Sequence, residues 1–175
     1  MKGLVLNGWR VFAHPLLLDQ LEKLATAVAD AKGKQPDTWQ GTASAKLLAA
    51  LRQLIFETIP SDPTRPEYRQ GETLGKDRKH WFRAKFGNGR FRLFFRYSSK
   101  DKAIIYAWVN DETTRRTYGS KTDAYAVFCK MLDRGNPPDT WEMLLKEVNT
   151  SGAQERLQSA QPDHPETSST ESSGS

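Results

Sequence analysis

Apolar residues in the first third of the chain recur at the spacing of a helical face. Between Pro15 and Gly33, and again before Pro60, leucine, isoleucine and valine stand three or four residues apart. This spacing is typical of helices that turn one side toward a core. The apolar positions of the two stripes are Leu17, Leu21, Leu24, Val28, and then Leu47, Leu51, Leu54, Ile55 and Ile59. We therefore predict two amphipathic helices, followed by a loop over residues 60–80 that is rich in proline and glycine.

The hydrophobic period changes between residues 81 and 109. Three runs rich in aromatic and β-branched residues are separated by turn signals at Asn88-Gly89 and Ser99-Lys100. Asn-Gly is typical of β-hairpin turns, so the runs predict three antiparallel strands. Apolar stripes after Asp123 and after Pro137 predict two further helices. Together these elements predict an α+β fold, with helices packed on a small antiparallel β-sheet.

The last 26 residues, 150–175, differ from the body of the chain. They contain only three apolar side chains, Ala153, Leu157 and Ala160, among many Ser, Thr, Gln, Glu and Pro residues. So little apolar surface does not offset the conformational entropy lost on folding. We predict one domain over residues 1–149 and a disordered, polar and acidic tail over residues 150–175.

Strand alternation sorts the first hairpin into two faces. With a turn centred on Asn88-Gly89, one face is apolar and the other is cationic. The cationic face carries Arg83, Lys85, Arg90, Arg92 and Arg96, with Phe94 among them. Like charges opposite one another destabilise a sheet, so we expect this face to bind a polyanion, with Phe94 as a surface for base stacking. The alternative is an arginine-rich face that is simply solvated.

Charge is distributed unevenly along the chain. Its net charge is +5, but residues 76–121 hold thirteen Lys or Arg against four Asp or Glu, a local excess of +9. A concentrated positive segment favours nucleic acid as a partner. The single Cys129 excludes a disulfide within the chain, and the three histidines are scattered. We expect no metal or other cofactor, no membrane segment and a cytoplasmic location.

A series of motifs runs in order along this basic body. It includes the hairpin over residues 83–97, Trp108-Val109-Asn110-Asp111-Glu112, Arg115-Arg116-Thr117-Tyr118-Gly119, Lys121-Thr122-Asp123-Ala124-Tyr125 and Arg134-Gly135-Asn136-Pro137-Pro138. In these motifs the chain resembles the YhaV toxins of bacterial type II toxin–antitoxin systems, over residues 7–148. Several motifs in the same order are more specific than one basic hairpin.

The resemblance implies a fold and a function. YhaV toxins are similar to the RelE/ParE superfamily, which implies a RelE-like α+β fold. It also implies an endoribonuclease that cleaves mRNA on translating ribosomes. The implied partner is a PrlF-type antitoxin, a DNA-binding dimer with a swapped-hairpin fold, through which the complex would bind operator DNA and repress its own operon.

The resemblance also implies roles for particular residues. Arg83 and Lys85 match two basic residues, one apart, on the first strand of a RelE-type hairpin, and Arg92 matches an arginine after an aromatic residue on the second. Arg83 and Arg92 would bind phosphate. Lys85 is the candidate general base, because nearby arginines lower the pKa of a lysine. His80 is a rival base, since histidine titrates near neutral pH.

Other basic and aromatic residues are expected around this centre. Arg116 or Arg115 would stabilise or protonate the leaving oxygen, and Tyr118 would stack on a base. Arg90 and Arg96 would contact the RNA backbone. The implied reaction is metal-independent attack of an RNA 2′-OH on the adjacent phosphate, which leaves a 2′,3′-cyclic phosphate and a 5′-OH.

Three other functions fit the same basic hairpin. A ParE-like inhibitor of DNA gyrase would need no nuclease residues. A non-catalytic nucleic-acid-binding module would show salt-dependent binding without a cleavage product. A pure interaction protein would use the cationic face only to receive an acidic antitoxin segment. An RNA-cleavage assay separates all three from the nuclease.

Overall fold

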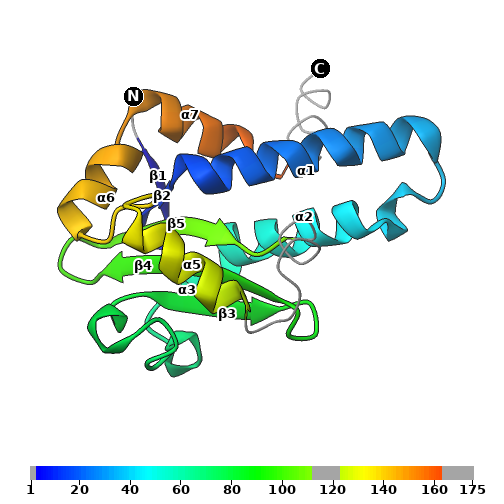
Figure 1. Ribbon diagram of the computed structural model, residues 1–175. Helices are drawn as coiled ribbons and strands as arrows, with labels where there is room; N and C mark the ends of the chain where they lie inside the picture. The colour runs from blue at the N-terminus through cyan, green and yellow to red at the C-terminus, as the bar shows by residue number, and fades with distance from the viewer. Residues whose placement is uncertain (1–2, 112–122, 163–175) are drawn as a thin grey trace, which may run out of the picture.

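The chain forms a five-stranded β-sheet with helices on both of its faces (Figure 1). The computed structural model describes residues 3–111 and 123–162. The strands are β1 (Leu4–Leu6), β2 (Trp9–Ala13), β3 (Phe82–Phe86), β4 (Phe91–Ser98) and β5 (Ala103–Val109). The main helices are α1 (Pro15–Lys34), α2 (Ala43–Gln53), α3 (Ile59–Ser61), α5 (Asp123–Asp133), α6 (Trp141–Val148) and α7 (Ser151–Ser159). None of the described helices is long and apolar enough to cross a membrane.

Strands β3, β4 and β5 form the predicted antiparallel meander, but the whole sheet is mixed. The strand order is β1-β2-β5-β4-β3, and β2 pairs with β5 in the parallel direction. The expectation of a purely antiparallel sheet was wrong at this one pairing. Parallel strands need a long crossover connection, and α1, α2 and the loop after them supply it. The prediction of an α+β fold is confirmed.

The register of the first hairpin is the predicted one. Phe86 pairs with Phe91, and Lys85 pairs with Arg92 across the turn. The second hairpin differs, because Ser98 pairs with Ala103 and the loop spans residues 99–102 instead of a tight turn. A bulge between Phe94 and Phe95 shifts the register further.

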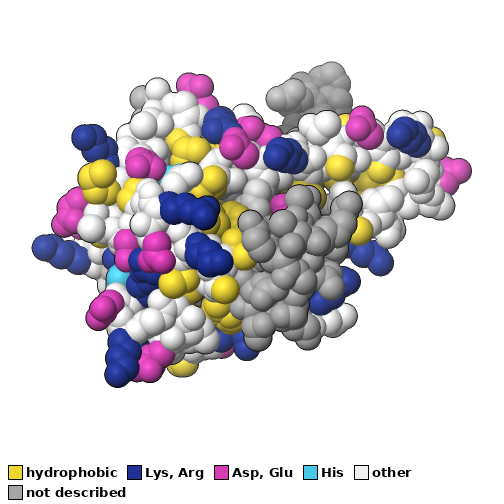
Figure 2. Space-filling model, in the orientation of Figure 1, with side chains coloured by type: hydrophobic (Ala, Val, Ile, Leu, Met, Phe, Trp, Pro, Cys, Tyr) yellow, Lys and Arg dark blue, Asp and Glu magenta, His cyan; other side chains and the backbone are white. Residues whose placement is uncertain are grey.

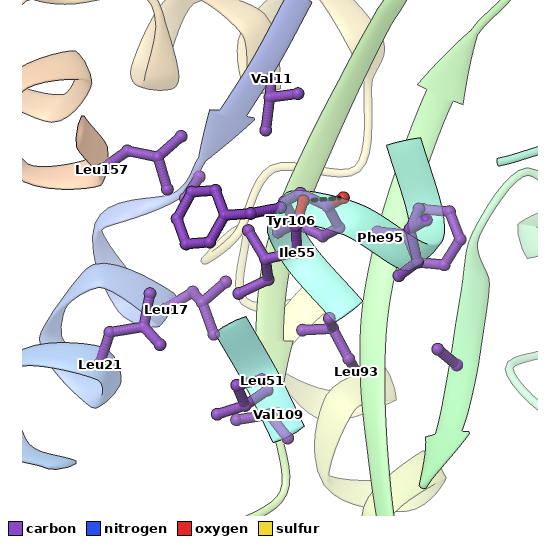
Figure 3. Packing of buried hydrophobic residues seen from close by; sticks show 14 of the residues in the cluster. Val11, Leu17, Leu21, Leu51, Ile55, Leu93, Phe95, Tyr106, Val109 and Leu157 are labelled. Atoms are coloured by element: carbon purple, nitrogen blue, oxygen red, sulfur yellow. Dashed lines mark hydrogen bonds between the residues drawn. The ribbon is translucent and has the colours of Figure 1, made fainter. Parts of the chain in front are cut away.

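Helices α1, α2 and α7 cover one face of the sheet, around the larger hydrophobic core. Leu17 and Leu21 of α1, Leu51 of α2 and Leu157 of α7 meet residues of β2, β4 and β5 there (Figure 3). The hydroxyl of Tyr106 donates a hydrogen bond to the carbonyl of Ile55 at 2.9 Å within this core. Burying the tyrosine without this partner would cost about 1–3 kcal/mol.

Helices α5 and α6 cover the other face, around a second core. Phe94 of β4 and Trp108 of β5 stack against Phe128 of α5 there. Strand β5 is consequently buried along its whole length. The hairpin face predicted to be open and cationic therefore lies partly beneath α5. Figure 1 shows α5 crossing the sheet in front of β4 and β5.

Helix α7 corrects the predicted start of the disordered tail. Ala153 and Leu157 are buried in the larger core, and the Arg156 guanidinium binds Asp19 at 2.6 Å and Glu22 at 2.8 Å on α1. The expectation of disorder was wrong for residues 151–159. Few apolar residues were enough, because their spacing puts them on one face of a helix. Residues 163–175 lie outside the described part of the chain.

Candidate active site

Two arginines and a tyrosine meet where α5 crosses the β3–β4 hairpin. The phenol oxygen of Tyr125 accepts a hydrogen bond from Nε of Arg83 and another from Nε of Arg92, both at 3.0 Å. The Arg92 guanidinium also lies 5.3 Å from the centre of the Tyr125 ring. Strand pairing places the two arginines, and helix packing brings the tyrosine over them. We call these three residues the arginine–tyrosine cluster.

The two guanidinium groups change the acidity of Tyr125. Burial opposes ionisation of the phenol, but the hydrogen bonds and positive charges of Arg83 and Arg92 outweigh it and lower the pKa of Tyr125 below its usual value. Hydrogen bonds donated to the charged form of an acid favour that form. The cluster therefore combines two anion-binding groups with a phenol that ionises more readily than an ordinary tyrosine.

Arg92 is buried, with only 8% of its surface exposed, and hydrogen bonds hold it in place. Its Nη1 donates to the carbonyl of Gly89 at 2.9 Å, and its backbone N–H donates to Oδ1 of Asn110 at 2.6 Å. Nδ2 of Asn110 in turn donates to the carbonyl of Arg90 at 3.0 Å. These contacts fix the hairpin turn to the end of β5, so the guanidinium keeps one orientation.

Arg83 is more accessible and is anchored by the long loop before β3. Its Nη1 donates to the carbonyl of Glu67 at 2.8 Å. The loop is itself braced by buried Gln70, which donates to the carbonyl of Arg78 and accepts from Thr73 and Leu74. The described hydrogen-bond partners of the two guanidinium groups are the Tyr125 phenol and the backbone carbonyls of Glu67 and Gly89.

Two other predicted residues border the cluster, and three lie outside the described residues. Lys85 is exposed on β3, directly across from Arg92. Arg90 is exposed in the hairpin turn, with its guanidinium 5.4 Å from the centre of the Phe91 ring. The expected residues Arg115, Arg116 and Tyr118 fall within 112–122, which the structure does not describe.

Phe94 does not form the stacking surface that was predicted. Its side chain is fully buried, with its ring stacked on Phe128 at a centroid distance of 4.3 Å. The prediction failed because strand alternation assigns a residue to a face but does not say whether a helix covers that face. This face of the hairpin is cationic at its rim and aromatic in its middle, and the aromatic middle, at Phe94, packs against α5.

Arg96 and His80 serve packing at the far end of the same face, away from the cluster. The Arg96 guanidinium lies between the rings of Trp81 and Trp141, at 5.6 and 5.4 Å, and donates to the carbonyl of Asp139 at 2.6 Å. Nε2 of His80 lies 2.7 Å from Oδ1 of Asp139. Neither described set of contacts involves the arginine–tyrosine cluster, so this geometry gives no support to an RNA contact by Arg96 or to His80 as the general base.

Asp139 is the centre of a clamp that holds the C-terminal end of α5. It accepts hydrogen bonds from Nε1 of Trp81 at 2.8 Å and from Nε of Arg78 at 3.1 Å. Arg78 also binds Asp133, at the end of α5, at 2.8 Å. Burial raises the pKa of Asp139, but the hydrogen bonds from His80, Trp81 and Arg78 lower it further than burial raises it. Tyr125 lies eight residues before Asp133 on this helix, about 12 Å along its axis.

Tyr125 is the functional candidate that sequence reasoning missed. It belongs to one of the quoted motifs, but its neighbours Ala124 and Phe128 defined the apolar stripe of the helix. From the sequence, a tyrosine at the edge of such a stripe is expected to pack against the core and have no functional role. Its role emerges only when α5 is placed over the hairpin, and the sequence gives no direct signal for that docking.

No metal centre is evident among the described residues. Within 3–111 and 123–162, no group of three His, Cys, Asp or Glu is placed to hold a metal ion. In the view of Figure 2, Lys and Arg side chains are interspersed with Asp and Glu over the described surface instead of forming one continuous patch.

Comparison with known proteins places this geometry in a family. A family model described as a toxin with endonuclease activity, of a toxin–antitoxin system, matches residues 11–149. The chain belongs to the YhaV toxin family. Toxin YhaV of Escherichia coli O6:H1 is 51% identical over 146 residues, which cover 83% of this chain and 95% of that relative. Ribonuclease toxin YhaV of Escherichia coli strain K12 is 51% identical over 143 residues, which cover 81% and 93%.

Membership in the YhaV family confirms the resemblance seen in the motifs. The chain is a toxin with endonuclease activity, and its toxin–antitoxin system implies an antitoxin partner. All three residues of the cluster lie within the matched range. Helix α7 lies beyond that range. No solved structure is significantly similar to this chain.

Proposed function

We propose that this YhaV-family toxin is a metal-independent endoribonuclease that cleaves mRNA on translating ribosomes, with the arginine–tyrosine cluster as its active site. One observation carries the proposal: two guanidinium groups and a phenol of lowered pKa converge at the hairpin. Arginine forks bind phosphate oxygens, and the acidified phenol adds a group for proton transfer. The name of the K12 relative as a ribonuclease toxin supports RNA as the substrate.

The reaction is an internal transesterification. The Tyr125 phenolate accepts the proton of the 2′-OH, and the 2′ oxygen forms a bond to the adjacent phosphorus. The bond from phosphorus to the 5′ oxygen breaks, and that oxygen receives a proton. Arg115 or Arg116 is the group expected to stabilise or protonate this leaving oxygen. The products are a 2′,3′-cyclic phosphate and a 5′-OH, so atoms and charge balance without water or a metal ion.

Arg83 and Arg92 stabilise the extra negative charge of the pentavalent transition state. Their fixed positions mean that little reorganisation is needed when the charge develops, which is the general basis of electrostatic catalysis. Lys85, exposed across from Arg92, approaches the same phosphate from the solvent side. It remains the alternative base if Tyr125 serves only to orient the arginines.

The antitoxin is expected to be of the PrlF type and to silence this site in the complex. A protein that covers the cluster would have to neutralise at least two arginines, which favours an acidic segment. The complex would then reach operator DNA through the antitoxin. These features follow from the family resemblance and are proposals for this chain.

The proposal is tested by inducing wild type and Arg83→Ala and mapping 5′ ends in total RNA. Arg83 is partly exposed, so its loss should leave the fold intact while abolishing growth arrest. We expect new 5′-OH ends within coding regions for wild type, and none for the variant. Arg65→Ala is the control, because Arg65 is exposed and its contact with Glu67 at 3.8 Å contributes little. A folded, toxic Arg83→Ala protein would contradict the site.

Two other results would redirect the function. Growth arrest without new RNA ends would favour the gyrase inhibitor. RNA binding by purified wild type without cleavage, on or off the ribosome, would favour the non-catalytic module.

A further inference from the structure

A hollow of about 310 Å³ lies beside the β3–β4 turn, on the face of the sheet opposite the arginine–tyrosine cluster. Helix α2 forms one wall, and the hairpin forms the other. Ligand sites in proteins commonly begin at about 300 Å³, so the hollow is large enough for a small aromatic group. The lining residues used below are Lys46, Leu47 and Ala50 of α2, and Phe86, Arg90 and Phe91 of the hairpin.

The lining combines apolar walls with a cationic rim. Leu47 is buried, and the half-buried ring of Phe86 stacks on Phe91 at a centroid distance of 5.3 Å. Lys46 and Arg90 are exposed at the rim, and none of the lining residues is acidic. Apolar aromatic walls beneath cations suit a flat ring attached to a polyanion, which describes a nucleobase on its sugar–phosphate chain.

The turn connects the hollow rigidly to the cluster. Gly89 accepts a hydrogen bond from Arg92, while Asn110 bonds both Arg92 and Arg90. At Gly87, φ is +62°, and a Cβ there would lie 2.7 Å from the Phe91 ring. Only glycine fits this position, so the turn keeps its tight form. A chain that passes around the turn would meet the cluster and the hollow at a fixed separation.

We propose that the hollow binds a nucleobase of the RNA, from a nucleotide that neighbours the one cleaved at the arginine–tyrosine cluster. The inference rests on the ribonuclease function proposed above. The RNA backbone passes over the hairpin turn, with Arg90 and Lys46 contacting its phosphates. The base enters between α2 and the Phe86 ring, and this pocket contributes to the choice of cleavage position.

The test measures binding of RNA that cannot be cleaved. A labelled 2′-O-methyl RNA, and a series that lacks one base at each position in turn, are titrated with full-length protein by fluorescence anisotropy. Ala50→Trp fills the hollow without removing a charge. Ala49→Trp is the matched control, because Ala49 is exposed on the same helix and does not line the hollow. Equal thermal unfolding midpoints of the two variants would show that the fold is intact.

We expect loss of one particular base to weaken wild-type binding about five- to one-hundredfold, the range for stacking of a base on an aromatic residue. Ala50→Trp should weaken binding of the complete RNA to a similar degree, and the affinity of this variant should be the same whether or not that base is present. Ala49→Trp should match wild type. Lys46→Glu, which leaves the hollow open, should weaken binding of every RNA in the series and reduce its salt dependence.

Other outcomes overturn the inference in distinguishable ways. If the RNA binds and Arg83→Ala weakens it, but Ala50→Trp matches Ala49→Trp, the hollow is not a base site while the proposed function stands. If Ala50→Trp impairs only assembly with the antitoxin, the hollow belongs to that partner. If wild type binds none of the RNAs, the inference fails, while the proposed cleavage on ribosomes is decided separately by the mapping of 5′ ends described above.

Discussion

The phenol of Tyr125 lies between two guanidinium groups, and this arrangement makes the phenol easier to ionise near neutral pH. An ordinary tyrosine, with a pKa of about 10, is almost fully protonated there. The charges and hydrogen bonds of Arg83 and Arg92 lower this pKa, so a larger fraction is present as phenolate. The same contacts orient both arginines, so on the proposed mechanism proton transfer and positioning would both depend on one oxygen atom.

Replacing Tyr125 with Phe tests whether this oxygen moves a proton. The ring would keep its edge-on contact with Phe94, at 5.7 Å between centroids, but the acceptor for both arginines would be lost. We expect cleavage to fall about 10²–10⁴-fold, the usual range for loss of a general base. The measurement is the rate of mRNA cleavage in a purified translation system, together with the thermal unfolding midpoint.

The pH dependence distinguishes the base from a purely structural role. If the phenolate is the active form, wild-type cleavage rises with pH until the lowered pKa of Tyr125 is passed, and the Phe variant loses this rise. A variant with reduced activity and an unchanged pH profile would assign the proton transfer to another group, with Lys85 the first to examine.

At this scale the sequence predicted part of the cluster. The register that places Arg83 and Arg92 followed from strand alternation around Asn88-Gly89, because a one-residue slip would turn every apolar side chain outward. Tyr125 could not be predicted, since its partners are 33 and 42 residues away and meet it only through the docking of α5. The burial of Phe94 was hidden for the same reason.

Helix α5 is the element that completes the candidate site, and the Asp139 clamp holds its far end. Asp139→Asn would weaken the hydrogen bonds from Arg78, His80 and Trp81. Removing hydrogen bonds to a charged group costs about 2 kcal/mol, so we expect the unfolding midpoint near pH 7 to fall by roughly 4–8 °C. Asp37→Asn is the control, because Asp37 is exposed on the loop between α1 and α2.

The effect of Asp139→Asn should depend on pH. The folded-state pKa of Asp139 is lower than that of the unfolded chain, near 3.9. Its carboxylate therefore stabilises the fold fully above that unfolded value, and this stabilisation is lost as the pH falls through the folded value. The difference in midpoint between wild type and variant should shrink on acidification below about pH 4. A difference independent of pH would mean that the amide merely packs less well.

Helix α7 is a second element whose role is structural. Leu157 is 1% exposed against the larger core. We expect Leu157→Ala to destabilise the protein by about 2–5 kcal/mol, as for other buried leucines. Chemical denaturation measures this directly. Glu155→Ala, on the exposed side of the same helix, should change stability by less than about 0.5 kcal/mol. Equal effects would show that α7 does not contribute to the fold in solution.

From the sequence, the existence of most helices and strands could be predicted better than which of them lie next to one another in the fold. The stripes of α1 and α2 and the runs of β3, β4 and β5 were clear because their periods differ. The parallel pairing of β2 with β5 had no local signal, since it joins segments about 90 residues apart in the sequence. Helix α7 was missed because its composition, taken without its spacing, was typical of disorder.

For the whole molecule, charge is the property that distinguishes the body from its last residues. Residues 163–175 carry three carboxylates and no Lys or Arg, so truncation after Pro162 raises the net charge from +5 to +8. We expect association with RNA at low salt to become faster, by up to about tenfold, and to depend more steeply on salt. Stopped-flow binding at several salt concentrations tests this.

Replacing Asp163, Glu166 and Glu171 with their amides provides the matched control for the truncation. It changes the charge without shortening the chain, so it should reproduce the faster association. Unchanged rates in both variants would show that the acidic residues do not influence the approach of RNA. A change in the truncated protein alone would point to the length of the segment instead of its charge.

The pairing of β2 with β5 also has a consequence for synthesis of the toxin. The sheet cannot close until β5 has been made, and Tyr125 is made later still. Contacts between such distant segments slow folding, because a long loop must close before they form. A nascent chain that stops within the hairpin would thus carry the phosphate-binding arginines without the residue that joins them. On the proposed mechanism, cleavage would therefore require synthesis of at least the first 125 residues.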